Sequence, residues 1–576
     1  AVTNSGSITG TARATKGDAY AAGFWLQDDG TDVVDVKGSL TNSGTITISA
    51  FGADSNSATA TGAYIEGEIS GSFVNSGTMT LLAQGGAGSN SAYAKGLYVE
   101  DDISGTLLNS GTISVTAIEN TNFATAIGVH VDGVLSGSVT NSGTLKAVAT
   151  SGAGSVSASG YKADSMSGTF SNTGKITASA TGSVAANTSS YGIKFDNFDG
   201  VISNVGEISA SGNGTNVYSI WLDAGTGTQN SNGGTGTLNI DTSDKITGKI
   251  RVDKQDVNLD AKGERRVFSF EDASTSTGTF TTSVSGLNTA WFTKGAGGSA
   301  PIYASVSTSD LGLPEGIMAD LGGMLGSITT QLQSNFGETE AMPSLPFLEV
   351  GQSFRHFISV DTQGLSYASR NEGGKTDASL RNVTIGAAGI TNAGADFAFG
   401  LGDLYGTGNN KTITDFDLNG FYLGGSVGKV FGSNYLDAGL GFGRLDSKVI
   451  RKIEGSAAAT SEFKSGFATM HLGVQREFYD DERVSITGFG QLRHTTQING
   501  GYTETGSTAN TTVGKTKNSV NEAKLGFEIS AAIGAAGTLT GSATAISRAY
   551  GGDDTTNIKV FGQQLDMINV RKNSEL

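Results

Sequence analysis

The stretch SGTLLNSGTISVTA at residues 104–117 decides the fold of the first part of this chain, because close variants of it recur along the sequence. SGSFVNSGTMTLLA occupies residues 70–83, and SGSVTNSGTLKAVA occupies residues 136–149. The turn asparagines follow one another at intervals of 31 to 38 residues, at Asn4, Asn42, Asn75, Asn109, Asn141, Asn172 and Asn204. A period of this length predicts a stack of repeated units, such as a solenoid.

Each repeat is predicted to contain three short strands. Apolar and polar residues alternate on both sides of the Asn-Ser-Gly turn, which places Leu108, Ile113 and Val115 toward an interior. A third alternating stretch, such as ATAIGVHVD at residues 124–132, follows a polar loop. One repeat cannot bury its apolar face alone, so the repeats must stack on one another. We therefore predict that residues 1–240 form a parallel β-solenoid in which the turn asparagines lie above one another.

The composition argues against several classes of function. The net charge is −17 and only 16% of the residues are charged, so the chain lacks the basic surface that binds phosphate backbones, and we predict no nucleic-acid partner. The chain has no cysteine and only four histidines, which excludes disulfides and thiolate metal centres. No run of 18 apolar residues is present, so no transmembrane helix is predicted.

A junction is predicted where all four prolines lie, between Pro301 and Pro346, because proline cannot sit inside a sheet ladder. Within this window, residues 314–336 carry apolar residues at helical spacing, which predicts one amphipathic α-helix. These apolar residues are Ile317, Leu321, Met324, Leu325, Ile328 and Leu332. The predicted parts are the solenoid at 1–240, a cap or junction at 241–305, a linker with the helix at 306–346, and a β-barrel-like domain at 347–576.

The last 230 residues have a different pattern, with long strands and long polar connections. Leu525, Phe527 and Ile529 alternate with polar residues, and the stretches 413–428 and 461–478 are two to three times as long as ordinary globular strands. Long segments that alternate between apolar and polar residues are typical of an antiparallel transmembrane β-barrel. The predicted fold class is therefore all-β, with a β-solenoid and a barrel-like domain joined by one helix.

This part of the chain resembles the autotransporters (type V secretion) of Gram-negative outer membranes. The resemblance rests on DFDLNGFYLGGSVGKVFGSNYLDAGLGFGRLDSKV at residues 415–449, VSITGFGQLRHTTQINGGYTETG at 484–506 and SVNEAKLGFEI at 519–529. The order of solenoid, linker helix and barrel is also that of the family. It implies that the barrel enters the outer membrane with the help of the barrel-assembly machinery, that the helix occupies the pore, and that the solenoid is displayed outside.

The chain also departs from the family pattern. About nine strands are predicted where the family has twelve, and the sequence ends on the polar stretch MINVRKNSEL at residues 567–576. Two interpretations therefore stay open: the β-domain forms a closed, membrane-inserted barrel, or it is truncated or rebuilt for another purpose.

No catalytic arrangement is predicted. The sequence contains no G-x-S-x-G elbow, and His130 occupies a repeat position that other repeats fill with Trp25, Tyr64, Tyr98, Lys162, Lys194 and Trp221. A position that accepts all of these side chains is predicted to be an outward surface column. We expect pore-facing or rim positions for His356, His471 and His494. The chain is therefore predicted not to be an enzyme.

One column of acidic residues is the only candidate metal site. The position two residues after the His130 column holds Glu66, Glu100, Asp132, Asp164, Asp196 and Asp223, with Gln27 in the first repeat. Stacked at a rise of about 4.8 Å, neighbouring carboxylates would repel one another. Either the column is a solvated acidic edge that limits sideways aggregation, or calcium bridges it through oxygen ligands from adjacent repeats.

These observations predict a non-enzymatic bacterial surface protein, in which an autotransporter-type β-domain displays a β-helical passenger for adhesion, aggregation or surface coating. Its partners would be the outer membrane, like molecules, or ligands on host and cell surfaces. The alternative is a self-assembling extracellular subunit of a layer, sheath or filament, whose β-domain contacts neighbours in place of lipid.

Overall fold

The protein is described by a computed structural model. It describes the whole chain except residues 28–33, 54–55, 87, 89–90, 225–234, 264, 273–277, 287–288, 296–299, 309–310, 312–353, 369–374, 411–413, 482, 534–536 and 570–576. The chain separates into two compact units, Ala1–Val306 and Ser307–Leu576, and each is described by itself.

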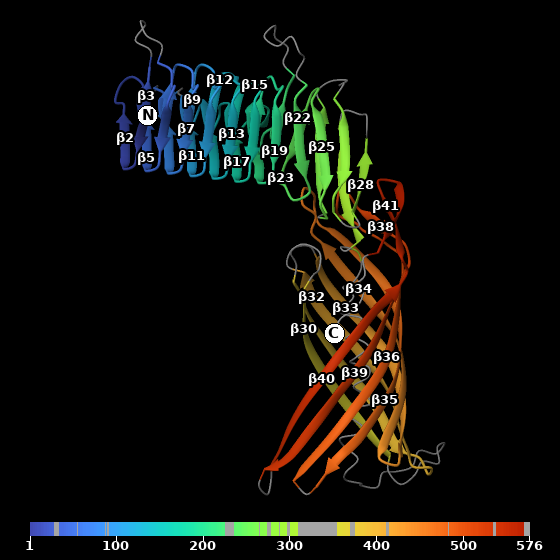
Figure 1. Ribbon diagram of the computed structural model, residues 1–576. Helices are drawn as coiled ribbons and strands as arrows, with labels where there is room; N and C mark the ends of the chain where they lie inside the picture. Colours follow the sequence, from blue (N-terminus) through green and yellow to red (C-terminus); the bar gives the residue numbers. More distant parts are fainter. Residues whose placement is uncertain are drawn as a thin grey trace. The chain divides into compact units, whose positions relative to one another are not determined.

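The first unit is built from coils of three strands, one coil for each sequence repeat. The repeat around Asn109 forms β10 (Thr106–Asn109), β11 (Thr112–Glu119) and β12 (Phe123–Leu135). Each strand pairs in parallel with the equivalent strands of the coils on either side, so that Asn109 lies opposite Asn75 and Asn141. The coils therefore stack into three parallel sheets, which run from the blue to the green end of the solenoid in Figure 1. This confirms the predicted parallel β-solenoid.

The strands of the solenoid fall into three sheets. The first contains β1 (Val2–Asn4), β4 (Ser39–Asn42), β7 (Ser72–Asn75), β10, β13 (Ser138–Asn141), β16 (Thr169–Asn172), β19 (Val201–Asn204), β22 (Thr237–Asp241), β25 (Asp256–Ala261) and β27 (Phe280–Val284). The second contains β2 (Ser7–Arg13), β5 (Thr45–Phe51), β8 (Thr78–Gln84), β11, β14 (Thr144–Ser151), β17 (Lys175–Gly182), β20 (Glu207–Gly212) and β23 (Lys245–Thr247). The third contains β3 (Ala19–Leu26), β6 (Ala58–Ile65), β9 (Ser91–Val99), β12, β15 (Val156–Met166), β18 (Thr188–Phe195), β21 (Asn216–Leu222), β24 (Lys249–Val252), β26 (Val267–Asp272), β28 (Thr289–Lys294) and β29 (Ile302–Ser307). A short 3-10 helix, η1 (Ala185–Asn187), precedes β18.

The parallel ladders continue past residue 240, where the solenoid was expected to give way to a cap. β22 pairs in parallel with β25, which pairs in parallel with β27 as far as Val284. Inward apolar residues such as Val257 and Leu259 keep the coil packed there although the Asn-Ser-Gly turn is missing. Strand pairing needs only backbone groups and an apolar inner face, so the loss of the repeated phrase does not mark the end of the ladders. An antiparallel pair, β26 with β29, follows.

A ladder of buried asparagine side chains runs along the first sheet. In each coil the Asn Nδ2 donates to the Oδ1 of the next asparagine, at 2.7 to 2.8 Å, from Asn4 through Asn42, Asn75, Asn109, Asn141 and Asn172 to Asn204. All seven side chains are buried. Each internal asparagine therefore has its amide and its carbonyl satisfied by neighbouring coils. The predicted stacking of these residues is confirmed.

The inner face of each coil is apolar, and it corrects one prediction. Ile113 and Val115 are fully buried, as expected, but Leu107 and not Leu108 is the inward residue before the turn. Asn109 itself points inward because it belongs to the buried ladder. Alternation along β10 then places Leu107 inside and Leu108 outside.

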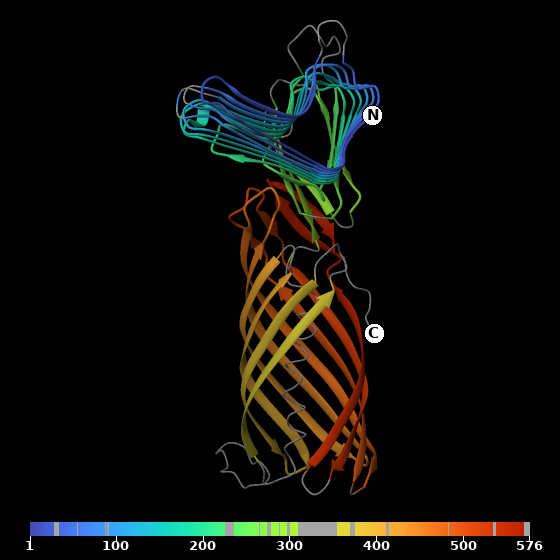
Figure 2. The same cartoon turned by 90° about the vertical axis from the view of Figure 1, so that its left-hand side faces the viewer.

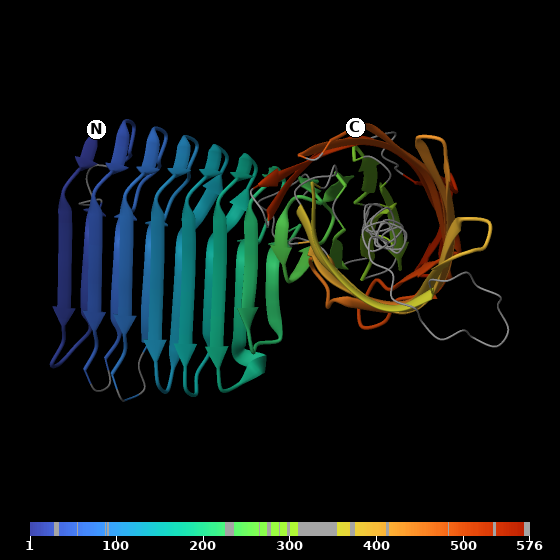
Figure 3. The same ribbon diagram turned by 90° about the horizontal axis from the view of Figure 1, so that it is seen from below.

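The second unit is dominated by one antiparallel sheet of nine strands, which agrees with the predicted count. In sheet order these are β30 (Phe354–Ala368), β31 (Lys375–Ile390), β32 (Ala395–Asn410), β33 (Thr414–Phe431), β34 (Asn434–Arg451), β35 (Ala459–Asp480), β36 (Val484–Asn499), β39 (Thr516–Ile533) and β40 (Gly537–Gly552). Figure 3 shows the sheet end on, curled into a ring. A small antiparallel sheet is formed by β37 (Tyr502–Thr503), β38 (Thr511–Val513), β41 (Thr555–Val560) and β42 (Gln563–Ile568).

The faces of the nine-stranded sheet differ in polarity. In β35, Met470 and Leu472 are 52% and 64% exposed, whereas Thr469 and His471 between and beside them are buried. Polar and ionic side chains on the buried face contact one another; for example, Arg493 and Arg548 both bind Glu522. Apolar residues outside and polar residues inside are the pattern of a transmembrane barrel.

The predicted helix at 314–336 lies outside the described residues and stays a prediction. Among the residues that are described, no helix combines the length and the hydropathy required to cross a bilayer.

Candidate functional site on the third sheet

The outer face of the third sheet is creased along its length. In β9, Lys95 Nζ lies 3.1 Å from the ring centre of Tyr98, and in β21 the rings of Tyr218 and Trp221 are 4.8 Å apart. Residues three apart in a straight strand point to opposite faces. Their contact here shows that each strand bends between them, with both side chains on the concave outer side. The outline of the stacked coils in Figure 2 has such an inward corner.

A glycine column produces the crease. Gly96 follows Lys95, and a Cβ atom on it would lie 2.3 Å from the carbonyl oxygen of Gly128 and 2.5 Å from Cγ2 of Ile113. Equivalent clashes arise at Gly62, Gly128, Gly160 and Gly192. In these five coils glycine permits the close approach of the bent strand to the second sheet and to the next coil, and Ser219 takes the equivalent position in β21.

One wall of the crease is the column that contains His130. The structure places Trp25, Tyr64, Tyr98, His130, Lys162, Lys194 and Trp221 in register on successive coils. Trp25 stacks on Tyr64 at 4.2 Å, and Tyr98 stacks on His130 at 5.1 Å. The column faces outward, as predicted, but the crease covers it, so that Tyr64 and His130 are only 8% and 7% exposed.

The electrostatics of His130 follow from these neighbours. Burial and the nearby Lys162 and Lys95 ammonium groups together lower the pKa of His130 to about 3, against the opposing effect of the Asp132 carboxylate. The imidazole is therefore neutral at physiological pH. Its Nε2 lies 3.0 Å from Lys162 Nζ and 2.8 Å from Asp132 Oδ1. The imidazole ring therefore lies between the Tyr98 ring, on which it stacks, and the Lys162 ammonium group.

The acidic column lies beside this wall, and the six carboxylate residues are in register on successive coils. Backbone hydrogen bonds fix this register; for example, Glu100 N donates to Ile65 O, and Asp196 N donates to Ala163 O. Several of the carboxylates contact side chains of the His130 column. These contacts are Tyr98 Oη to Asp132 at 2.6 Å, Lys194 to Asp196 at 2.5 Å and Lys162 to Asp164 at 4.0 Å.

Burial and like charges act together on two members of the acidic column. Burial raises the pKa of Asp164, and Asp132 and Asp196 on the adjacent coils raise it further. Burial also raises the pKa of Asp223, with Asp253 of the next coil adding to the effect. Within the described part of the chain, no three His, Asp or Glu side chains are arranged to hold one metal ion. The calcium interpretation of the column therefore stays a prediction.

We expect millimolar calcium to leave the thermal midpoint of solenoid unfolding unchanged relative to a chelator, because side-chain partners already contact several of these carboxylates. The measurement is circular dichroism of the full chain in detergent, with magnesium as the matched control. A different result would support the calcium interpretation. In that case calcium, but not magnesium, would raise the midpoint by more than about 4 °C, roughly 1 kcal/mol for a domain of this size. The double variant Glu100→Gln with Asp132→Asn would abolish this rise.

The opposite wall of the crease was not predicted. It contains Lys95, Ile127, Ser159, Tyr191 and Tyr218, most of them buried although they point outward. The glycine that recurs at one position of the third strand, in GFWLQ, GAYIE, GLYVE, GVHVD, GYKAD and GIKFD, was the available signal. A strand glycine at a fixed position indicates a bend or a close backbone approach.

Together, the two units define a class of protein. A long-stranded antiparallel sheet that is curled into a ring and apolar on its outside is an outer-membrane type of β-domain. Here it is preceded in the chain by a parallel β-solenoid with a patterned outer face.

Comparison with known proteins identifies the β-domain. The family model described as the autotransporter beta-domain matches residues 357–572. The chain is similar to the translocator domain of the autotransporter NalP from Neisseria meningitidis, at 14% identity and a TM-score of 0.28, covering 42% of this chain and 89% of that one. It is also similar to the beta domain of the Bordetella autotransporter Brka, at 14% identity and a TM-score of 0.24, covering 36% and 94%. A search of curated proteins found no match.

Residues 357–572 form an autotransporter beta-domain, which confirms the resemblance seen in this part of the sequence. The β-domain places the protein in the Gram-negative outer membrane, where the solenoid is the passenger displayed on the cell surface.

Proposed function

We propose that the passenger is a non-enzymatic surface protein that acts in adhesion, aggregation or coating of the cell through the creased face of its third sheet. The barrel-assembly machinery inserts its β-domain into the outer membrane. The observation that carries this proposal is the series of ring and charge contacts along the crease, from Trp25 stacked on Tyr64 to Arg251 placed 3.9 Å from the centre of the Trp221 ring.

A repeated surface suits attachment better than catalysis. The crease presents an aromatic or basic side chain on every coil, with a carboxylate beside it on six of the seven, at intervals of about 4.8 Å. Repeated weak contacts along one rod add up to avidity. The side chains that could act as acid or base are engaged with each other; His130 is neutral and contacts Lys162 and Asp132. The apolar outer face of the β-domain favours this function over the alternative of a subunit whose β-domain packs against neighbours in place of lipid.

Removing the positive charges of the crease should weaken attachment several-fold. Lys162 and Lys194 are ion-paired with Asp164 and Asp196, and Lys249 is ion-paired with Glu271 at 3.4 Å. In the triple variant Lys162→Gln, Lys194→Gln and Lys249→Gln, the acidic column loses two of its cationic partners and Glu271 loses a third. This face then repels other negatively charged surfaces. The measurement compares adhesion and settling of cells that display the wild-type or the variant passenger, with display quantified by an epitope tag on intact cells.

A matched control replaces three lysines of the second sheet by glutamine, so that the net charge changes equally. These lysines are Lys146, Lys175 and Lys245. Equal loss in both variants would assign attachment to overall charge and would contradict a role for the crease. A hydrolytic activity of the wild-type protein that His130→Ala abolishes would contradict the non-enzymatic part of the proposal.

A further inference from the structure

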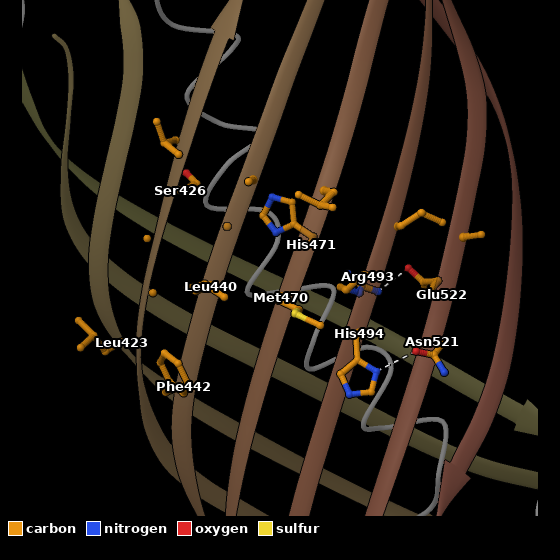
Figure 4. A pocket seen from close by; sticks show the side chains of 18 of the residues that line it. Leu423, Ser426, Leu440, Phe442, Met470, His471, Arg493, His494, Asn521 and Glu522 are labelled. Atoms are coloured by element: carbon orange, nitrogen blue, oxygen red, sulfur yellow. Dashed lines mark hydrogen bonds and ion pairs between the residues drawn. The ribbon is translucent and has the colours of Figure 1, made fainter.

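A cavity of about 1100 Å³ lies along the wall of the β-domain, over β32 to β40. Its lining includes the buried, inward-facing His471, Arg493 and Glu522 together with residues of the outer face. Leu440, Met470 and Leu492 line it and are 52% to 63% exposed, so they belong to the apolar face that meets lipid. Small residues such as Gly425 and Ala523 also line it, and they leave the wall hollow where larger side chains would fill it. Figure 4 shows Leu440 and Met470 on neighbouring strands.

A polar pair lies on the same wall at this cavity. His494 Nδ1 and Asn521 Oδ1 are 2.8 Å apart, and the two residues are direct partners in the pairing of β36 with β39. His494 is also opposite Met470 in the pairing of β35 with β36, which places it on the apolar outer face. This differs from the pore-facing or rim position expected for His494. His494 Nδ1 donates to Asn521 Oδ1, and the Nδ2 group of the same amide can donate to a ligand in the cavity.

Positive charge follows the polar pair along the same face. Lys517 lies four residues before Asn521 on β39 and is exposed, and it pairs across the sheet with Ile498, four residues after His494 on β36. Side chains four apart in a strand share one face. The outer wall therefore passes from the apolar cavity to a hydrogen-bonding pair and then to an ammonium group.

We propose that this cavity binds an anionic membrane lipid. One acyl chain lies against Leu440, Met470 and Leu492, and the phosphate of the headgroup accepts hydrogen bonds from Asn521 Nδ2 and Lys517 Nζ, while His494 Nδ1 holds the Asn521 amide in place through its Oδ1. The sequence of apolar, hydrogen-bonding and cationic surface along the wall matches the order of acyl chain, glycerol and phosphate in such a lipid. The membrane supplies this ligand at the site without any further partner.

The test is native mass spectrometry of the full chain in detergent, with phosphatidylglycerol or phosphatidylcholine of identical acyl chains added. We expect the wild-type protein to retain phosphatidylglycerol several-fold more than phosphatidylcholine. The double variant His494→Ala with Asn521→Ala should lose this preference, whereas Asn419→Ala, an exposed residue outside the cavity, should keep it. Heat-modifiable gel migration verifies that each variant is folded.

A second pair of variants tests the cavity itself. Ala523→Trp places a large side chain in the cavity and should reduce retention of both lipids, whereas Leu525→Trp, on the same outer face but outside the cavity, should not. Equal retention of the two lipids by the wild-type protein, or unchanged retention in Ala523→Trp, would overturn the proposal. A second polypeptide retained in place of lipid would assign the cavity to a protein partner and would also overturn it.

Discussion

Replacing Asn109 by Ala is expected to lower the free energy of unfolding of the passenger by about 2 to 5 kcal/mol, because the change leaves two buried groups without partners. Asn75 Nδ2 loses its 2.8 Å bond to Asn109 Oδ1, and Asn141 Oδ1 loses its 2.7 Å donor. Each buried group that loses its partner costs about 1 to 3 kcal/mol. Denaturant unfolding measured by tryptophan fluorescence reports on the passenger, since Trp25, Trp221 and Trp291 are the only tryptophans of the chain.

The neighbouring Ser110 provides the control, because it is exposed and Ser110→Ala should change stability by less than 0.5 kcal/mol or so. A loss at Asn109 as small as that at Ser110 would show that the ladder contributes little to stability. The coils would then be held together by backbone pairing and apolar burial alone.

Replacing Asp244 by Asn is expected to remove a pH dependence from passenger stability. Asp244 is fully buried, and burial raises its pKa to about 7, with the Asp241 carboxylate adding to the rise and the Arg266 and Lys262 cations opposing it. The folded chain therefore keeps this proton between pH 4 and 7, where the unfolded chain has lost it. Stability then falls as pH rises through this window, by about 1.4 kcal/mol per pH unit.

The same unfolding assay at pH 5 and pH 8 measures the effect. In the wild-type passenger, Asp244 alone should lower the free energy of unfolding by roughly 3 kcal/mol between these values. In the Asp244→Asn variant, the free energy of unfolding should change less between pH 5 and pH 8, by the amount that Asp244 contributes. The variant Asp101→Asn, at an exposed position, should show the same change as the wild type. A variant with the same pH slope as the wild type would show that Asp244 is ionised in the folded passenger at pH 5.

Much of the fold was predictable because the relevant interactions repeat. A buried asparagine at one position of every coil can be satisfied only by the asparagines above and below it, so the spacing of the turns was enough to set the register from Asn4 to Asn204. The alternation in β35 similarly predicted which side chains face lipid. Leu108 was assigned to the wrong face because the turn asparagine was not counted as an inward residue.

The candidate site was predicted in part. The acidic column and the His130 column could be aligned from the sequence, and both are in register. Their contacts could not be predicted, because alternation alone treats each strand as straight. The bend at Gly96 and its equivalents brings Lys95 against Tyr98 and covers His130, and a straight strand would have left both columns in solvent.

The sequence by itself determined the solenoid, its register and the long alternating strands of the β-domain, because each of these depends on a local pattern that repeats along the chain. The tertiary structure alone decided three features. These are the crease that turns two surface columns into one packed ladder, the buried environment that raises the pKa of Asp244, and the cavity beside His494 and Asn521. Each arises where residues from different strands approach one another, and such distances depend on how the sheets bend and not on the order of residues within one strand.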